Sequence, residues 1–336
     1  MLLRKIMKKS RQAIIRSRTK KHDKPLPAPT EEESQRVTYL RERFKGLFIP
    51  EPSDAPPSEK EWLANVNRLK ELVLLEDPRE FLRWDVILKT MSVTHAGYTT
   101  PELKYLQTLP TWDSRWRQAI EESQVGHPIP HWQYPKSSGN LIHHGYHVAQ
   151  FEEKTGLSVD GMDFILEFGG GYGSMCRLIH QLGFRGRYVI FDLPAFSALQ
   201  EFYLGSLNLR FHTLDLFDVG NPGVLCISDP DVLTSILSES QENSNPLFIA
   251  TWSLSETPID LRSFILPLIS SFKAFLIAYQ DQFNEINNIE FFARWRASIQ
   301  EVQWEDWKLE HLPNHNRYLV GVKEGMSQEG EIASVP

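Results

Sequence analysis

Near the middle of the chain lies a glycine-rich turn that could bind a cofactor. Its residues are Glu167, Phe168, Gly169, Gly170, Gly171, Tyr172 and Gly173. An apolar run with strand character, 163–168, precedes it, and a segment with helical spacing follows. Glycine tolerates positive φ angles and has no Cβ, so the turn can be tight and a ligand can approach its backbone closely. This strand–turn–helix unit predicts a cofactor site.

The glycine spacing does not fit the Gly-x-Gly-x-x-Gly pattern of nicotinamide-dinucleotide sites. Counting from Gly169, the third glycine position holds Ser174, and counting from Gly171 it holds Cys176. About 20 residues beyond the turn, Asp192 and Leu193 end the second predicted strand, where a carboxylate can accept both hydroxyls of a ribose. The alternative role for Asp192 is to cap the next helix.

The fourth predicted strand ends at Trp252 and is followed by Ser253 and Glu256. Ligands of open α/β sheets bind where the strand order reverses, and this strand lies at that point. We therefore expect these side chains to border the reacting group. Glu256 could instead cap the helix that begins near Pro258.

Histidines gather ahead of the glycine turn, as His143, His144 and His147, with His311 and His315 near the end of the chain. Spacings of three and four residues can bring two imidazoles to one helical face, as a metal site requires. No nearby acid or cysteine completes a ligand set, so no metal is predicted. The cluster is expected to line the entrance of a pocket.

The elements that must position these residues change character at about residue 160. Before it, helices are predicted over 34–46, 58–75, 80–91, 101–106, 112–122 and from 141 to 155. After it, strands are predicted over 163–168, 187–193, 209–214, 246–252, 273–280, 302–311 and 317–323, with helices over 173–183, 195–206, 229–239, 259–270 and 288–300. The last two strands have only a turn between them and must pair as an antiparallel hairpin. The alternation predicts an α/β fold with a doubly wound, seven-stranded, mostly parallel sheet and an N-terminal helical cap.

Charge is unevenly distributed over the 336 residues. From Arg4 to Lys21 there are nine basic residues and no acid; removing them from the 36 Lys and Arg leaves 27 against 43 Asp and Glu, a net charge near −16. Such an acidic body argues against nucleic-acid binding. The basic head is compatible with peripheral membrane contact, with a transit peptide and with a solvated tail.

Hydropathy and cysteine content indicate a cytoplasmic protein. No apolar run approaches the roughly 18–20 residues of a membrane span. The two cysteines, Cys176 and Cys226, cannot form a disulfide framework. We expect a basic, proline-rich flexible head and linker over 1–57, a helical cap or lid over 58–158, a cofactor-binding domain over 159–325 and a flexible tail over 326–336.

Glu167 ahead of the glycines resembles motif I of class I S-adenosylmethionine-dependent methyltransferases. The wider pattern resembles the sugar O-methyltransferase family, through Asn140-Leu141-Ile142-His143-His144-Gly145-Tyr146-His147, the glycine turn, Phe191-Asp192-Leu193-Pro194 and Thr251-Trp252-Ser253-Leu254-Ser255-Glu256. The resemblance covers about 80–324 and leaves out the basic head.

The resemblance implies S-adenosyl-L-methionine as cofactor and a hydroxyl of a sugar or glycan intermediate as methyl acceptor. In this family, Asp192 would bind the ribose hydroxyls and Asp215 the adenine amino group, and Leu216 or Phe217 would pack against the adenine ring. The implied cofactor-binding residues are Glu167, Gly169, Gly170, Gly171, Tyr172, Gly173, Asp192, Leu193, Asp215, Leu216, Trp252, Ser253 and Asn140. A hydroxyl acceptor needs a general base, and the candidates, in order, are Glu256, His315, and His143 or His144.

Two alternatives stay open: a methyltransferase for another small molecule or a peptide, and an inactive methyltransferase-like binding subunit. A homo-oligomer also stays open. Because 140–151 leads directly into the first strand, we expect it to form a lid near the glycine turn. Replacing His143 and His144 together by Ala should then greatly reduce turnover and leave thermal stability nearly intact.

Overall fold

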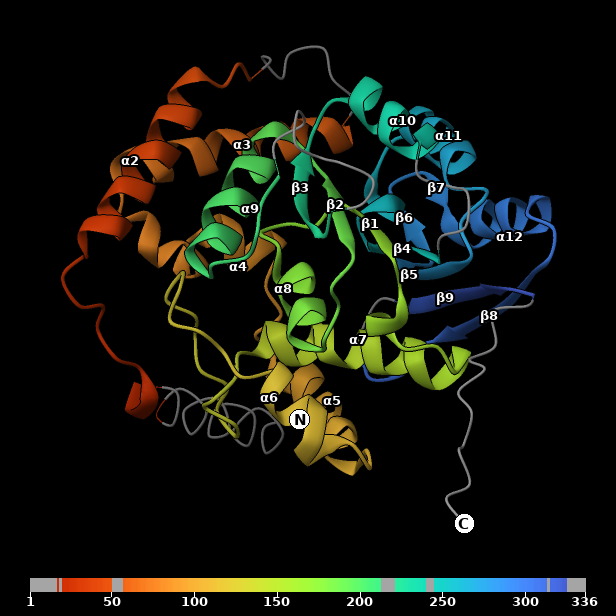
Figure 1. Ribbon diagram of the computed structural model, residues 1–336, viewed down its shortest axis with the longest axis horizontal. Helices are drawn as coiled ribbons and strands as arrows, with labels where there is room; N and C mark the ends of the chain where they lie inside the picture. Colours follow the sequence, from red (N-terminus) through yellow and green to blue (C-terminus); the bar gives the residue numbers. More distant parts are fainter. Residues whose placement is uncertain are drawn as a thin grey trace, which may run out of the picture.

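The computed structural model describes residues 17, 20–49, 57–212, 221–239, 245–312 and 315–324. In these residues seven strands form one twisted sheet at the centre of the molecule (Figure 1). Across the sheet their order is β3 (Gly223–Ile227), β2 (Arg187–Phe191), β1 (Phe164–Phe168), β4 (Pro246–Thr251), β5 (Ala274–Gln280), β9 (Asn316–Lys323) and β8 (Val302–Lys308).

The strand pairing has one reversal of order and one antiparallel hairpin. Strands β1 to β5 pair in parallel, and β9 is antiparallel to both β5 and β8. The chain runs outward from β1 to β3, returns to β4 on the other side of β1, and continues to β5. The predicted fold class, a doubly wound, seven-stranded, mostly parallel sheet, is therefore confirmed, and the reversal lies between β1 and β4.

Side chains alternate between two cores, one on each face of the sheet. Along β1, Ile165 belongs to one core, and Phe164, Leu166 and Phe168 belong to the other. The second core is closed by helices α10 (Pro230–Glu239), α11 (Ile259–Leu268) and α12 (Asn288–Ser298). The first is closed by α7 (Gly139–Thr155), α8 (Ser174–Gln181) and α9 (Pro194–Ser206).

The N-terminal helices pack on this first face, outside α7 and α9. They are α2 (Glu31–Gly46), α3 (Pro57–Leu75), the 3-10 helix η2 (Pro78–Arg83), α4 (Asp85–Thr90), α5 (Ala96–Thr108), the π-helical turn η3 (Trp112–Trp116) and α6 (Arg117–Ala119). The predicted helix over 80–91 is thus divided, because Trp84 takes an extended conformation between η2 and α4. Short elements complete the chain: η4 (Val159–Gly161), η6 (Leu254–Glu256), β6 (Gln282–Phe283) and β7 (Ile286–Asn287).

The prediction of the third strand over 209–214 is wrong. Of its described residues, Phe211 makes a single parallel bridge to Val224, and the third strand of the sheet is β3. The run Val224-Leu225-Cys226-Ile227 is continuously apolar, as suits a parallel strand covered on both faces. Residues 209–212, the described part of the predicted strand, lie beside β3 through this bridge instead.

Part of the predicted flexible head is folded against the body. Helix α2 begins with a capping box formed by Thr30 and Glu33, and it packs on α9 through the buried Leu40 and Phe44. The cap satisfies backbone N–H groups that a helix N-terminus otherwise leaves without a partner.

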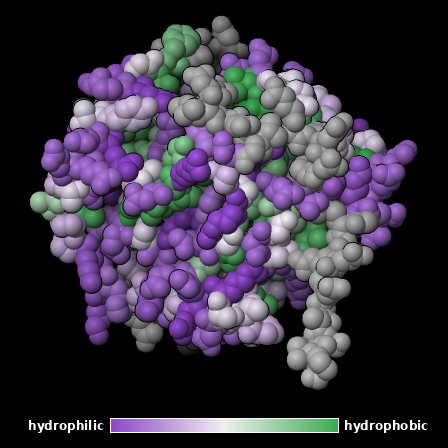
Figure 2. All heavy atoms as spheres, viewed as in Figure 1, coloured by the Kyte–Doolittle hydropathy of each residue, from purple (hydrophilic) through white to green (hydrophobic). Residues whose placement is uncertain are grey.

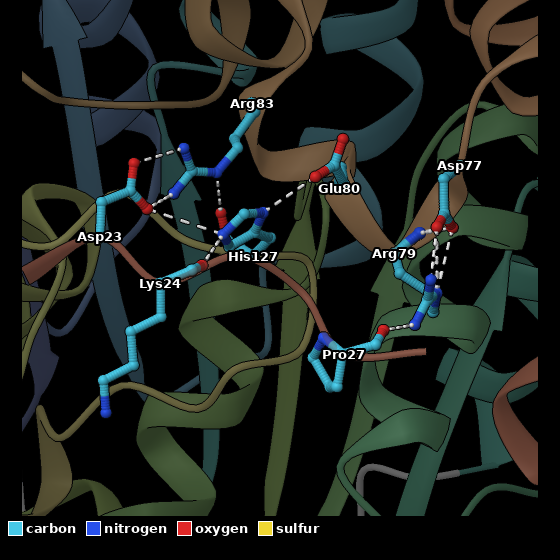
Figure 3. A network of polar contacts seen from close by, with 8 residues as sticks. All are labelled: Asp23, Lys24, Pro27, Asp77, Arg79, Glu80, Arg83 and His127. Carbon is cyan, nitrogen blue, oxygen red and sulfur yellow. Dashed lines mark hydrogen bonds and ion pairs between the residues drawn. The ribbon is translucent and has the colours of Figure 1, made fainter. Parts of the chain in front are cut away.

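The segment before α2 is tied to η2 and to the loop around His127 (Figure 3). Arg83 forms an ion pair with Asp23, and the backbone oxygen of Pro27 accepts from Arg79 Nη1 at 2.9 Å. His127 Nε2 donates to the backbone oxygen of Lys24 at 2.7 Å. These contacts fasten residues 23–27 to the cap; the domain boundaries themselves stay predictions.

The molecular face in Figure 2 is mainly polar, with small and separate apolar patches. Within the described part of the chain, no helix combines the length and the apolar character needed to cross a membrane.

Candidate functional site

The glycine turn connects β1 to α8 at the point where the strand order reverses. Gly169, Gly171 and Gly173 have φ angles of +71°, +58° and +94°, a region that side chains with a Cβ rarely adopt. The N–H of Gly169 donates to Phe191 O at 2.8 Å, and that of Gly173 donates to Gly170 O at 2.9 Å. One hydrogen bond therefore joins the turn to the end of β2, and the other joins the two ends of the turn to each other.

Close neighbours explain why two of these positions admit only glycine. A Cβ on Gly169 would lie 2.3 Å from the Cβ of Ser253, and one on Gly170 would lie 2.6 Å from Ile190. At Gly171 the nearest atom to such a Cβ is the sulfur of Met91, at 3.4 Å, an ordinary contact distance. Gly171 is thus constrained by its φ angle and not by crowding.

Glu167 is buried against the turn, where a Cβ on Gly170 would lie 3.1 Å from its carboxyl group. Its side chain is 3% exposed, and Oε2 accepts the hydroxyl of Tyr188 at 2.8 Å. Burial raises the pKa of Glu167 to about 8, although the Tyr188 hydrogen bond works against the rise. At neutral pH the carboxyl is mainly protonated and packs against the turn; its role in binding a cofactor stays a prediction.

Asp192, at the end of β2, is joined to the turn by hydrogen bonds. Oδ2 accepts the N–H of Gly171 and the amide of Gln200, both at 3.0 Å, and Oδ1 accepts the N–H of Leu193 at 2.8 Å. Burial raises the pKa of Asp192 to about 7. Helix α9 starts at Leu193 without a side-chain cap, so Asp192 is not its capping residue.

The helical cap reaches the turn at its N-terminal end. Asn140 donates to the hydroxyl of Tyr172 at 2.8 Å, and its Oδ1 accepts the N–H of Val93 at 3.2 Å. Since Met91 also lies against Gly171, two separated segments of the chain, 91–93 and the start of α7, meet at the turn. Asn140, at the start of the segment 140–151, therefore lies beside the glycine turn; its role in binding a cofactor stays a prediction.

Trp252 follows β4 in an unusual backbone conformation, with φ +64°. Its N–H donates to Ala278 O at 2.7 Å, and its indole N–H donates to Asn316 Oδ1 at 2.6 Å. The next residue, Ser253, donates through Oγ to Phe168 O at the end of β1. A bulky residue in this region is strained and persists only where its surroundings fix it, which is common at functional sites.

Glu256 lies on the same loop, in η6. Its Oε1 accepts the amide of Gln280 at 3.3 Å, and burial raises its pKa to about 6, with Glu61 of α3 adding to the rise. Helix α11 has no side-chain cap, so Glu256 does not cap it. The loop is held from inside by the buried Arg262, which donates to Ser255 O at 2.6 Å and to Asn288 Oδ1 at 2.7 Å.

His143 lies on α7 with its ring nearly parallel to the indole of Trp252, the centroids 5.4 Å apart. Its Nδ1 meets Oε1 of Glu102, a buried residue of α5, at 2.7 Å. His311 Nε2 meets the same oxygen at 2.8 Å. Glu102 was not anticipated, because a single glutamate in a helical segment carries no sequence signal.

The other candidate histidines differ in environment. Burial lowers the pKa of His144 to about 3, and the pKa of His147 also falls well below its ordinary value. His315 has a side chain that is 74% exposed, 4.0 Å from Asp281. Among the described residues, no three His, Cys, Asp or Glu side chains are grouped so that they could hold a metal ion.

Asp215 and Leu216 lie outside the described residues. The acid that follows β3 is Asp229, whose Oδ1 accepts the N–H of Asp231 at 2.8 Å in the first turn of α10. The strand-end position used to predict Asp215 therefore belongs to another residue.

Comparisons with known proteins give likenesses of structure. No protein-family model matches the chain, and no curated protein matches it by sequence. An O-methyltransferase from Bacillus cereus in complex with SAH has a TM-score of 0.38 at 12% identity, over 71% of this chain and 95% of its own. Magnesium protoporphyrin IX methyltransferase from Synechocystis PCC 6803 with bound SAH has a TM-score of 0.36 at 12% identity, over 67% and 99%. At these identities and TM-scores the likenesses decide nothing about this chain's reaction, so the fold class rests on the strand order and the function on the site.

Proposed function

We propose that this protein is an S-adenosylmethionine-dependent methyltransferase that methylates a hydroxyl group of a sugar or glycan intermediate. The observation that carries the proposal is the hydrogen bond between the glycine turn and Asp192 at the reversal of strand order. Open α/β sheets bind their ligands at this place. The turn fits no dinucleotide spacing, and its acid-plus-glycine pattern is the one that the class I resemblance assigns to S-adenosylmethionine.

The residues present fit the cofactor. The turn offers backbone without side chains, and Met91 in ordinary contact distance of Gly171 is a flexible side chain that can give way. Asp192 Oδ1 accepts the N–H of Leu193, and an ionised carboxylate oxygen has capacity for a second donor. We assign it the ribose hydroxyls, with the exposed Leu193 next to it as an apolar contact.

When bound, S-adenosylmethionine supplies a methyl group on a sulfonium, which is already a strong electrophile. The chain must hold donor and acceptor in line and accept the proton of the acceptor hydroxyl. Two candidate bases border the reversal of strand order, His143 and Glu256. With its pKa raised to about 6, Glu256 is mainly ionised at neutral pH and can accept a proton or a hydrogen bond from the acceptor.

Aromatic side chains at the rim support a sugar acceptor, because the apolar face of a sugar stacks on an indole. Trp84 and Trp116 of the cap are buried in the core and are not available. Trp252 and Trp62 are partly buried; Trp62 packs edge-on against Phe196 at the start of α9. We assign the acceptor's contact to Trp252, since it also meets His143.

The test is transfer of a labelled methyl group from S-adenosylmethionine to a panel of sugars, nucleotide-sugars and glycolipid intermediates. We expect incorporation into at least one hydroxyl-bearing sugar, with loss of incorporation in Asp192→Ala. Labelling only of other small molecules or of peptides would correct the acceptor class. Cofactor binding without transfer to any acceptor would favour the binding-subunit alternative.

A further inference from the structure

Glu102 is a buried carboxylate that two histidines from distant parts of the chain approach. It lies on α5 with no exposed surface, and its Oε1 receives His143 Nδ1 at 2.7 Å and His311 Nε2 at 2.8 Å. Its Oε2 is buried and has no hydrogen-bond partner in the described part of the chain. A buried charge needs a compensating partner, and here the partners are imidazoles and not Lys or Arg.

The charge of Glu102 determines where the protons on the imidazoles must be. Burial works to raise its pKa, but the imidazoles of His143 and His311 outweigh burial and hold the pKa below its ordinary value. An ionised carboxylate can only accept hydrogen bonds, so Nδ1 of His143 must carry a hydrogen. In neutral His143 the lone pair is then on Nε2.

His143 lies at the reversal of strand order, where the lone pair on Nε2 could accept a proton from a bound acceptor. Its ring is stacked on Trp252, directly after β4 at the reversal of strand order. Among the described residues, Nε2 of His143 takes part in no hydrogen bond. A ring fixed by a carboxylate on one nitrogen and by an indole on its face presents the other nitrogen in a defined direction.

The neighbouring histidines do not share this arrangement. His147 meets Tyr318 through Nδ1, and its Nε2 is buried without a partner among the described residues. The Nδ1 atom of His144 is buried and likewise lacks a partner there. Among the histidines of α7, His143 is therefore the one with a hydrogen bond to a carboxylate in the described part of the chain.

We propose that Glu102 is a positioning residue that holds His143 as the Nδ1–H tautomer, so that Nε2 serves as the general base for methyl transfer. This inference rests on the proposed function. In the step, the acceptor oxygen forms its bond to the methyl carbon while the carbon–sulfur bond breaks, and that electron pair stays on sulfur. The hydroxyl proton moves to Nε2, Glu102 stabilises the imidazolium, and the proton is then released to solvent.

The first test does not depend on activity. Nitrogen and proton chemical shifts of histidine-labelled full-length protein, assigned with His143→Gln, report the tautomer of His143. We expect the Nδ1–H tautomer. In Glu102→Gln the carboxylate that requires a hydrogen on Nδ1 is gone, so the Nε2–H tautomer of His143 should become populated. The other titratable groups around this pair are unchanged in the variant; they are His131, His144, His147, His311, Tyr146 and Tyr318.

The second test is kinetic. The acidic limb of the kcat/KM profile reports protonation of the essential base. Removing the negative charge of Glu102, which stabilises a protonated base beside it, should move that limb to lower pH in Glu102→Gln. We expect kcat to fall by about 10- to 100-fold, a part of the roughly 10²–10⁴-fold that a general base contributes, with unchanged affinity for S-adenosylmethionine. A purely structural role would lower activity without moving the limb.

The matched control is Glu153→Gln, at the same α5–α7 interface, where Glu153 Oε2 accepts the Tyr105 hydroxyl at 2.7 Å. It should leave the tautomer of His143, the acidic limb and kcat unchanged. An Nε2–H tautomer of His143 in the wild-type protein would overturn the positioning role, whatever the activity and even if Glu102→Gln does not fold. An Nδ1–H tautomer in a protein that methylates no acceptor would overturn the proposed function and leave the tautomer assignment standing.

Discussion

The backbone N–H of Gly171 donates to Oδ2 of Asp192 at 3.0 Å, so the acid that ends β2 also fixes the turn that ends β1. Gln200 reinforces the contact by donating both to Asp192 and to Gly171 O, the latter at 2.9 Å. Asp192, the proposed ribose ligand, and the glycine turn are therefore one hydrogen-bonded unit, so a substitution in either one alters the geometry of both.

Asp192→Ala is expected to weaken binding of S-adenosylmethionine by about 2–4 kcal/mol, because it removes two charge-assisted hydrogen bonds to the ribose. Isothermal titration calorimetry measures the loss. The control is Asp163→Ala, just before β1 at the opposite end of the strand, where Asp163 accepts the N–H of Asn245 at 3.1 Å. A loss smaller than about threefold in Asp192→Ala would move the ribose contact to another residue.

Gly171→Val is expected to fold and to lose cofactor binding, because its branched side chain would occupy the space above the turn. It should also be destabilised by about 1–3 kcal/mol through its positive φ angle. Gly156→Val is the matched control: Gly156, at the C-terminal end of α7, has φ +69°, and a Cβ added there would meet no atom within 4 Å.

Both variants should lose similar stability in urea unfolding, and only Gly171→Val should lose cofactor binding. Equal cofactor affinity in the two folded variants would contradict the assignment of the turn.

Glu167 should make stability depend on pH. Its pKa is raised to about 8 from an ordinary 4.5, so the folded state holds this proton more tightly than the unfolded chain does. The free energy of unfolding should therefore fall as pH rises from about 4.5 to about 8, and this decline should be absent in Glu167→Gln. Relative to the wild type, the variant should gain stability between pH 5 and pH 9, as measured by urea unfolding.

The surface substitution Glu310→Gln serves as the control and should show no such gain, since Glu310 is exposed. If the difference in unfolding free energy between the wild type and Glu167→Gln were the same at pH 5 and pH 9, Glu167 would not be titrating in this range.

The pairing of His143 with Glu102 changes what is expected of the histidine substitutions. Replacing His143 by Ala leaves the buried Glu102 with His311 as its remaining imidazole partner. Leaving a buried charge without any partner lowers the free energy of unfolding by about 3–5 kcal/mol. Because His311 still contacts Glu102, His143→Ala should lose only a part of that. His143→Ala should thus lower both turnover and thermal stability, unlike the expectation from sequence for the double variant.

His144→Ala removes a partly exposed imidazole whose buried Nδ1 has no partner among the described residues, so its thermal stability should fall less than that of His143→Ala. Thermal unfolding of the two single variants side by side measures the difference. Equal losses would mean that Glu102 draws no stabilisation from His143.

The sequence allowed the sheet and the turn to be predicted because their signals are local. Glycines after an apolar run mark the turn that ends β1, and the short link between β8 and β9 requires a hairpin. Glu102 could not be found in this way, because its partners His143 and His311 are 41 and 209 positions away. The third strand was misplaced because the alternating pattern that begins at Leu209 and the continuous run that begins at Val224 both resemble strands, and pairing with β2 decides between them.

Calorimetric titration of the full-length protein with S-adenosylmethionine at neutral pH tests the cofactor assignment, on which the proposed methyl transfer depends. We expect saturable binding to a single site, weakened in Asp192→Ala and unchanged in Asp163→Ala. Absence of measurable binding to the folded wild-type protein at millimolar S-adenosylmethionine would contradict the assignment.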